Sequence, residues 1–274
     1  MSPSPKRQRQ RERQQQARAQ AAVEEKKQQQ KRTWLGIGGI VALVVVLALA
    51  FSIFGGGNDS KSDDEGAATS TTTAGTDNDT DDVECPPEDG ASEPRLNFPS
   101  SPPNCLEDGA NYEAVFDTTA GEIRVALNSD DTPGTVNNFV FLARYGYYDG
   151  TEIFRSDPSI DILQGGAPHT NSASDPGPGY TIADEGSDWT YEPGDLVMAR
   201  TAAPDSAGAQ FFFSTGDNTA NLNSQGTYVV FGKTTAGLDV LEAIMDTHED
   251  DPSSGLGGHP NPVPVINKVT IVQN

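Results

Sequence analysis

The feature that most constrains this chain is an uncharged run of 21 residues, 34–54 (WLGIGGIVALVVVLALAFSIF). A helix of this length spans about 30 Å, which is the hydrocarbon thickness of a bilayer. The run therefore predicts one transmembrane helix. A cleaved signal peptide is the alternative, because residues 48–50 (ALA) resemble a cleavage site. The apolar run continues past that site through Phe54, which favours an uncleaved anchor.

The distribution of charge gives this span a direction. Residues 1–32 hold ten of the 18 Lys and Arg against three acids, a net charge of +7, whereas the rest of the chain carries −29. Because basic segments stay on the cytoplasmic side, we expect residues 1–33 to be a cytoplasmic head and everything after residue 54 to lie outside the plasma membrane. Nucleic-acid binding by the head is the alternative. Beside a membrane span, contact with anionic lipid is the simpler interpretation, and no nucleic-acid partner is expected.

Two segments of unusual composition follow the span. Residues 55–83 are rich in Gly, Ser, Thr and Asp and predict a flexible acidic linker. Residues 84–110 are rich in proline and contain the two cysteines of the chain, Cys85 and Cys105. Outside the cell such a pair most often forms a disulfide, and closing a loop of about twenty residues contributes on the order of 3 kcal/mol. We therefore expect a stapled lead-in to the next domain.

Residues 111–274 carry the pattern of a folded, mostly β domain. Apolar residues alternate in YEAVFDT and EIRVALN, which predicts a hairpin over residues 112–128. Thr132 and Pro133 are typical of a helix start, and a second helix is expected at residues 238–245. Further short strands are expected at residues 195–199, 210–215, 227–232 and 268–273. Many short strands with two helices suggest a closed antiparallel barrel.

Four segments in this order resemble the cyclophilin-type peptidyl-prolyl cis-trans isomerases. They are PGTVNNFVFLARYGYYDGT, FRSDPSIDILQGG, GDLVMARTAAPDSAGAQFFFST and YVVFGK. The resemblance implies a closed eight-stranded β-barrel capped by two α-helices, with no metal and no cofactor. It implies isomerisation of X–Pro bonds in proline-containing polypeptides. Combined with the predicted anchor, it suggests a monomer that assists the folding of exported or surface proteins.

The resemblance also assigns roles to individual residues. Arg155 matches the arginine that reaches the prolyl amide, Gln164 the glutamine that holds it, and Phe212 a wall of the proline pocket. These three are the expected catalytic residues. The expected substrate-binding residues are Ile160, Ile162, Ala199, Arg200, Thr201, Gln210, Leu222 and Tyr228. Purely structural roles remain as alternatives. Arg155 could be a surface ion-pair partner of Asp157 or Asp161, and Phe212 and Leu222 could be ordinary core residues.

The segment between Arg155 and Gln164 is one residue longer than the family pattern. Counting forward from Arg155 places Ile160 and Asp161 at the apolar pair, whereas counting back from Gln164 places Asp161 and Ile162 there. We expect Ile160 and Ile162 to face the pocket, with Asp157 and Asp161 turned to solvent.

Two functions of different classes are consistent with these residues. Rotation about an X–Pro bond is slow because it breaks amide resonance, with a barrier of roughly 18–20 kcal/mol. A guanidinium held against the prolyl nitrogen favours the twisted state, so Arg155 predicts an isomerase. A catalytically weak module that binds proline-containing segments is the alternative, because the segment after Arg155 departs from the family pattern.

Overall fold

The computed structural model describes residues 83–274. The predicted cytoplasmic head, the predicted span and the linker up to residue 82 lie outside the described residues. Within residues 83–274, none of the helices combines the length and the apolar character that crossing a bilayer requires.

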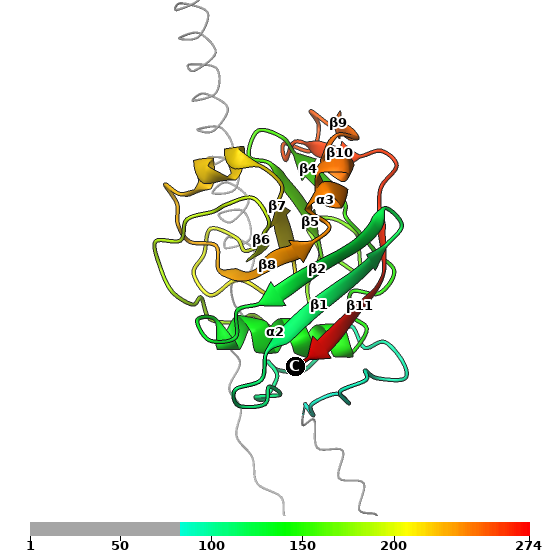
Figure 1. The fold of residues 1–274 in the computed structure, drawn as a ribbon, viewed down its shortest axis with the longest axis vertical. Coiled ribbons are helices and arrows are strands. Elements are labelled where there is room, and N and C mark those ends of the chain that lie inside the picture. The colour runs from blue at the N-terminus through cyan, green and yellow to red at the C-terminus, as the bar shows by residue number, and fades with distance from the viewer. Residues whose placement is uncertain (1–82) are drawn as a thin grey trace, which may run out of the picture. The chain divides into compact units, whose positions relative to one another are not determined.

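The described part of the chain forms one antiparallel sheet of eleven strands with two α-helices and a short 3₁₀ helix, η1 (Figure 1). The strands are β1 (Tyr112–Thr118), β2 (Gly121–Leu127), β3 (Thr151–Glu152), β4 (Arg155–Asp157), β5 (Ile162–Gly165), β6 (Asp195–Met198), β7 (Phe211–Ser214), β8 (Val230–Ala236), β9 (His248–Asp250), β10 (Gly258–Pro260) and β11 (Val265–Gln273). The helices are α2 (Pro133–Arg144), η1 (Asp217–Leu222) and α3 (Leu238–Met245). The strand order is β3-β11-β1-β2-β8-β6-β7-β5-β4-β10-β9.

Strands β1 and β2 form the predicted hairpin, and their side chains alternate as expected. Tyr112, Ala114 and Phe116 of β1 are buried, while the residues between them are partly exposed. Across the hairpin Ala114 pairs with Val125 and Phe116 with Ile123. Because successive side chains of a strand point to opposite faces, this alternation places one face of the hairpin in the core.

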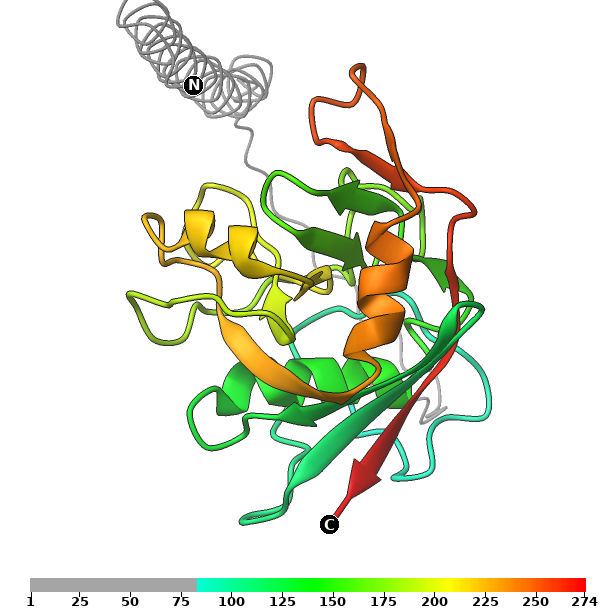
Figure 2. The same cartoon turned by 45° about the horizontal axis from the view of Figure 1, so that its top comes forward.

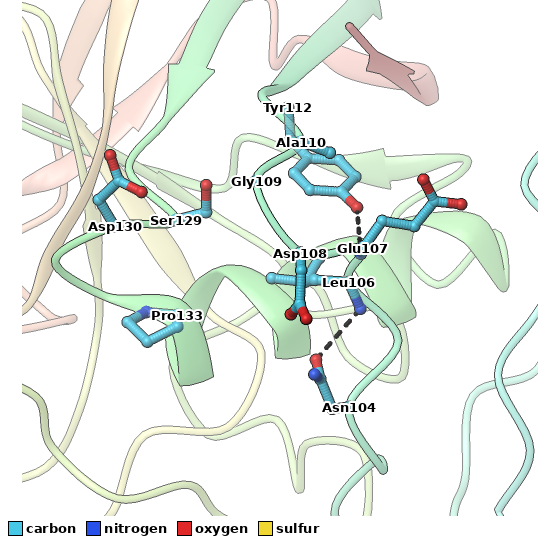
Figure 3. A pocket seen from close by; sticks show the side chains of 10 residues that line it. All are labelled: Asn104, Leu106, Glu107, Asp108, Gly109, Ala110, Tyr112, Ser129, Asp130 and Pro133. Carbon is cyan, nitrogen blue, oxygen red and sulfur yellow. Dashed lines mark hydrogen bonds between the residues drawn. The ribbon is translucent and has the colours of Figure 1, made fainter.

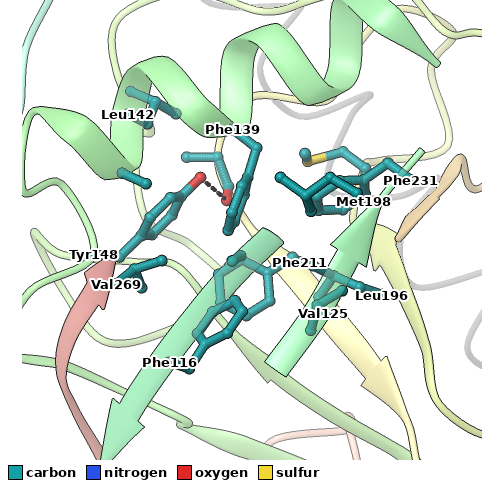
Figure 4. Close-up of a cluster of buried hydrophobic side chains, with 14 of the residues drawn as sticks. Phe116, Val125, Phe139, Leu142, Tyr148, Leu196, Met198, Phe211, Phe231 and Val269 are labelled. Atoms are coloured by element: carbon teal, nitrogen blue, oxygen red, sulfur yellow. Dashed lines mark hydrogen bonds between the residues drawn. The ribbon is translucent and has the colours of Figure 1, made fainter. Parts of the chain in front are cut away.

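The central strands bury both of their faces, and each face belongs to a different hydrophobic cluster. In β7, Phe211 and Phe213 are fully buried in the main core together with Phe116 and Phe139 (Figure 4). Phe212, between them, points to the other face and belongs to a second, smaller cluster. The main core fills the space between the strands and α2, as Figure 4 shows.

The two α-helices pack on different strands. Helix α2 contacts β11, whereas α3 contacts β2 and β5 (Figures 1 and 2). Helix α3 has the bounds that the sequence predicts. Helix α2 begins at Pro133, as the sequence predicts, with the proline in the first turn where its missing N–H costs nothing.

The cap of α2 differs from the sequence expectation. Thr132 stands at the N-cap position, but its hydroxyl donates to the Asn128 carbonyl at 2.8 Å instead of capping the helix. The free amides of the first turn are bound by Glu185, which lies some fifty residues further along the chain. Its carboxylate accepts from the Gly134 and Thr135 amides at 2.9 and 2.7 Å and from the Thr135 hydroxyl at 2.6 Å. A distant carboxylate therefore ties the 167–190 loop to the start of α2.

This cap leads to a prediction about stability. Glu185→Gln removes the negative charge that faces the helix N-terminus and one of the two strong acceptors, so we expect the free energy of unfolding to fall by about 1–2 kcal/mol. Glu242→Gln is the control, because Glu242 is exposed on α3. Urea unfolding of both variants measures the difference. Equal midpoints would show that the Glu185 contacts contribute nothing to stability.

The fold class is all-β and antiparallel with few helices, as predicted. The strand count is eleven in the described residues instead of eight, because β3, β4, β9 and β10 contain only two or three residues each and leave no alternating pattern to detect. Strand β8 begins at Val230 instead of residue 227, since the Tyr228 amide donates to the Tyr191 hydroxyl rather than to a neighbouring strand. Closure of the sheet into a barrel stays a prediction.

Residues 83–110 contain no helix or strand and pack along α2. Cys85 and Cys105 are joined by a disulfide, as the sequence predicts. The Cys105 amide donates to the Asn137 side chain of α2 at 2.7 Å, and the Ala91 amide to the carbonyl of Arg144 at 2.7 Å. Phe98 is buried in the main core against Phe141. The lead-in is therefore an integral part of the folded domain.

Candidate active site

Four neighbouring strands bring the candidate catalytic residues into one row. Arg155 of β4 pairs directly with Gln164 of β5, Gln164 with Phe212 of β7, and Phe212 with Val197 of β6. Directly opposed residues of adjacent strands present their side chains on the same face. The strand register thus places a guanidinium, an amide and an aromatic ring side by side on the face opposite the main core.

Arg155 is held by three partners. Its Nε donates to the Leu256 carbonyl at 2.6 Å, its Nη1 to Gln164 Oε1 at 2.9 Å and its Nη2 to Asp157 Oδ2 at 3.0 Å. The side chain is 17% exposed. Burial lowers the pKa of Arg155, and the Asp157 carboxylate opposes that shift. Arginine stays protonated in proteins, so the site holds a permanent, largely desolvated positive charge.

Gln164 extends this hydrogen-bond chain towards the next segment. Its Nε2 donates to Gln210 Oε1 at 2.9 Å, and Gln210 Nε2 donates to the Ala173 carbonyl at 3.3 Å. The Gln164 amide therefore accepts from Arg155 and donates to Gln210, which fixes its orientation. The two glutamines link the guanidinium to the residues preceding β7.

Phe212 belongs to the second hydrophobic cluster. Ile162, Tyr191, Val197 and Leu222 are buried with it, and Ile160, Ala199 and Tyr228 are partly exposed against it. The Phe212 and Tyr228 rings meet edge to face at 5.7 Å. An apolar cluster with a partly exposed edge, next to a largely desolvated charge, is suited to hold an apolar ring close to the guanidinium.

Tyr191 fixes the backbone of Tyr228. Its hydroxyl donates to the Tyr228 carbonyl at 3.1 Å and accepts from the Tyr228 amide at 2.9 Å. Burial raises the pKa of Tyr191 to about 12, so the phenol remains protonated at neutral pH. No motif in the sequence singled out Tyr191, which stands outside the four family-like segments.

Two of the expected substrate-binding residues are engaged elsewhere. The Arg200 side chain is 9% exposed and pairs with Asp184 at 2.6 Å. The Thr201 amide and hydroxyl are both bonded to the Ser206 hydroxyl. Their side chains therefore order the 200–206 loop, and only backbone groups of this segment, as the resemblance implies, are candidates for contact with a peptide.

Asp157 corrects one expectation. We expected it to face solvent, but its side chain is 12% exposed and ion-paired with Arg155. The extra residue of this segment is absorbed between β4 and β5, where Asp161 adopts a left-handed backbone with φ of 46°. The Asp161 carboxylate accepts from the Asn218 amide at 2.8 Å, so it too has a partner in the protein.

A Ser-His-Asp series next to Arg155 does not form a hydrolytic site. Ser156 Oγ lies 2.7 Å from His248 Nδ1, and His248 Nε2 lies 3.0 Å from Asp250. A nucleophilic hydroxyl must reach its substrate, whereas Ser156 is fully buried. The series ties β4 to β9 instead. Within residues 83–274 no group of three or more His, Cys, Asp or Glu is placed to hold a metal ion.

A pocket of about 140 Å³ lies away from this row, between the lead-in and the start of α2 (Figure 3). Its lining includes Asn104, Tyr112 and Asp130. The Tyr112 hydroxyl accepts from the Glu107 amide at 2.8 Å, which closes the turn beside the pocket. None of the row residues lines it, so it is separate from the candidate active site.

Comparison with known families identifies the domain. The sequence model of the cyclophilin type peptidyl-prolyl cis-trans isomerase family matches residues 114–272, which is more than half of the chain. The chain belongs to this family. Cyclophilins are peptidyl-prolyl isomerases, and the domain that carries the row from Arg155 to Phe212 is therefore an isomerase domain.

Individual relatives agree with this assignment. The chain is 42% identical to peptidyl-prolyl cis-trans isomerase B of Bacillus subtilis over 127 residues, covering 46% of this chain and 84% of the relative. It is 34% identical to isomerase B of Escherichia coli, covering 57% of this chain and 98% of the relative. A solved cyclophilin of Cryptosporidium parvum, crystallised in the presence of the dipeptide Ala-Pro, superposes with a TM-score of 0.51 at 28% identity over 59% of this chain and 99% of its own.

Proposed function

We propose that this cyclophilin isomerises X–Pro bonds of exported or surface proteins, with Arg155, Gln164 and Phe212 as its catalytic residues. The observation that carries the proposal is the row itself. A desolvated guanidinium lies one strand from Gln164 and two strands from Phe212, all on one face of the sheet. The related cyclophilin was crystallised in the presence of the dipeptide Ala-Pro, which supports proline-containing peptides as the ligand class.

The proposed mechanism is electrostatic. In the planar amide the lone pair of the prolyl nitrogen is shared with the carbonyl, whereas in the twisted amide it is localised on nitrogen. The Arg155 guanidinium stabilises the localised lone pair, and the cluster around Phe212 holds the proline ring and excludes water. Shortening isomerisation from tens of seconds to milliseconds requires about four decades in rate, or roughly 5.5 kcal/mol.

A module that binds proline segments without useful catalysis is the second candidate. The Arg155–Asp157 ion pair favours it, because a carboxylate at 3.0 Å offsets part of the positive charge that the mechanism needs.

Measuring cis-to-trans isomerisation of an Ala-Pro-containing peptide by the purified full-length chain separates the two functions. Acceleration by three decades or more over the uncatalysed rate supports the isomerase. Binding of the peptide with no acceleration would establish the binding module instead.

We further propose that the chain is a single-pass protein of the plasma membrane that acts as a monomer, with the isomerase domain outside. The uncharged run at residues 34–54, the basic head before it and the acidic chain after it support this topology. A disulfide in the described domain fits an oxidising compartment. One chain supplies every residue of the row, so catalysis needs no second copy.

The topology predicts a defined proteolysis pattern. Protease added to intact cells should remove the isomerase domain and leave the basic head protected, as antibodies to each end would detect. Recovery of a soluble form that lacks the first fifty or so residues would instead demonstrate cleavage at residues 48–50.

A further inference from the structure

The Arg155 guanidinium is held by more than its strand partner Gln164. Asp157, two residues further along β4, binds Nη2, and the Leu256 carbonyl, about a hundred residues away, binds Nε. A guanidinium has five N–H groups. Three of them are occupied by these partners, which leaves one N–H on each Nη atom. The direction in which those two groups point is fixed by the three bonds together.

Asp157 is itself immobilised. Its Oδ1 accepts from the Ser159 amide at 3.1 Å and from the Ser159 hydroxyl at 2.6 Å, while Oδ2 accepts from Arg155. One carboxylate oxygen is therefore bound to the turn after β4 and the other to the guanidinium. This turn leads through Ile160, which packs against the cluster that contains Phe212, to Ile162, which belongs to that cluster. Asp157 connects the position of the charge to the wall of the apolar cluster.

The segment that presents the Leu256 carbonyl is docked closely on β4. Gly258 pairs with Ser156, and the turn between β9 and β10 is closed by the Asp251 amide, which donates to the Gly257 carbonyl at 2.9 Å. A Cβ on Gly257 would lie 2.8 Å from the Ser156 carbonyl oxygen and 3.1 Å from Asp157 Cβ. Only glycine allows the turn to approach this closely.

We propose that Asp157 and the Leu256 carbonyl are positioning groups for Arg155, and that the β9–β10 turn sets the direction of the guanidinium N–H groups. The inference rests on the proposed function, because this direction matters only if Arg155 acts on the prolyl amide. Neither Asp157 nor the Leu256 carbonyl contacts the substrate. Their effect is to hold two N–H groups in one direction, and a displacement of about 1 Å at a catalytic group can cost up to about 10²-fold in rate.

Two glycines of the same turn provide a matched test. Gly257 and Gly255 both have positive φ, 97° and 66°, so alanine strains the backbone at either position. A Cβ at Gly257 collides with β4, whereas a Cβ at Gly255 meets nothing within 4 Å. We expect Gly257→Ala in the full-length chain to lower kcat for a proline peptide by about tenfold with little change in KM, and Gly255→Ala to change kcat less than about twofold.

A second pair of variants tests Asp157 without moving the backbone. Asp157→Asn keeps an oxygen acceptor for Arg155, so it should retain more of kcat than Asp157→Ala, which removes the acceptor. In an Arg155→Ala background, both Asp157→Ala and Gly257→Ala should have no further effect on kcat, since the group that they position is gone. Urea unfolding of each variant identifies any that fail to fold. If a variant fails to fold, the kcat of Asp157→Asn is measured in its place to test the positioning role.

The outcomes separate the two proposals. An inactive unmutated chain would overturn the proposed function. An active chain in which Gly257→Ala and Gly255→Ala have equal kcat, or in which either positioning substitution lowers kcat equally with and without Arg155, would overturn the positioning role and leave the isomerase function intact.

Discussion

Arg155→Ala is expected to lower kcat/KM for a proline peptide by about 10²–10³, a loss of roughly 3–4 kcal/mol of transition-state stabilisation. The loss is large because the guanidinium is the only charged group in the row from Arg155 to Val197, and it acts from a largely desolvated position. Arg155→Lys should recover little of the activity. A compact ammonium cannot bond Gln164, Asp157 and the Leu256 carbonyl at once and still face a substrate.

The contacts of Arg155 add a cost in stability that must be measured alongside activity. Removing the arginine leaves the Asp157 carboxylate, 12% exposed, without its ion-pair partner, and we expect a loss of about 1–3 kcal/mol in unfolding free energy. Arg124→Ala is the matched control. Arg124 pairs with Glu113 on the hairpin and is 40% exposed, so its removal should leave kcat/KM unchanged. Full activity in a folded Arg155→Ala variant would remove Arg155 from the mechanism.

The helices and strands that local sequence patterns determine could be predicted from the sequence. Alternation in residues 112–128 predicted the hairpin, Pro133 the start of α2, and residues 238–245 the bounds of α3. The candidate site residues were assigned from the resemblance, and the strand register brings Arg155, Gln164 and Phe212 side by side. Although one extra residue separates Arg155 from Gln164, the extra length is taken up in the connection after β4, and the two remain directly paired.

The contacts that could not be predicted are those made by groups distant in sequence or by the backbone. Glu185 reaches α2 from some fifty residues away, and the Leu256 carbonyl reaches Arg155 from about a hundred. A backbone carbonyl leaves no signature in the choice of side chain at its position. For Asp157, the ion pair with Arg155 that stayed open as an alternative does form. Only its exposure differs from the expectation, because the Asp157 side chain is 12% exposed instead of facing solvent.

The largest loss in the free energy of unfolding is expected from the substitution of Phe211 in β7. Its neighbour Phe212 points to the opposite face of the sheet. Phe211 packs in the main core against Phe116, Phe139 and Tyr148, with ring centroids 5.4–5.9 Å apart. Figure 4 shows it among these rings. Phe211→Ala should therefore lower the free energy of unfolding by about 3–5 kcal/mol, because a fully buried ring leaves a cavity that the surrounding sheet cannot close.

Phe212→Ala is the comparison that separates core from site. Phe212 is also buried, at 3% exposure, but it belongs to the smaller cluster, whose edge at Ile160 and Tyr228 is open to solvent and can relax around the lost ring. We expect it to cost less stability than Phe211→Ala and to lower kcat/KM by at least about tenfold, since in the proposed mechanism the cluster around Phe212 holds the proline ring. Urea unfolding and peptide isomerisation, measured on both variants at a temperature where both are folded, give the two quantities. If Phe212→Ala matched Phe211→Ala in stability and kept the activity of the unmutated chain, Phe212 would be an ordinary core residue and the second cluster would not be the proline site.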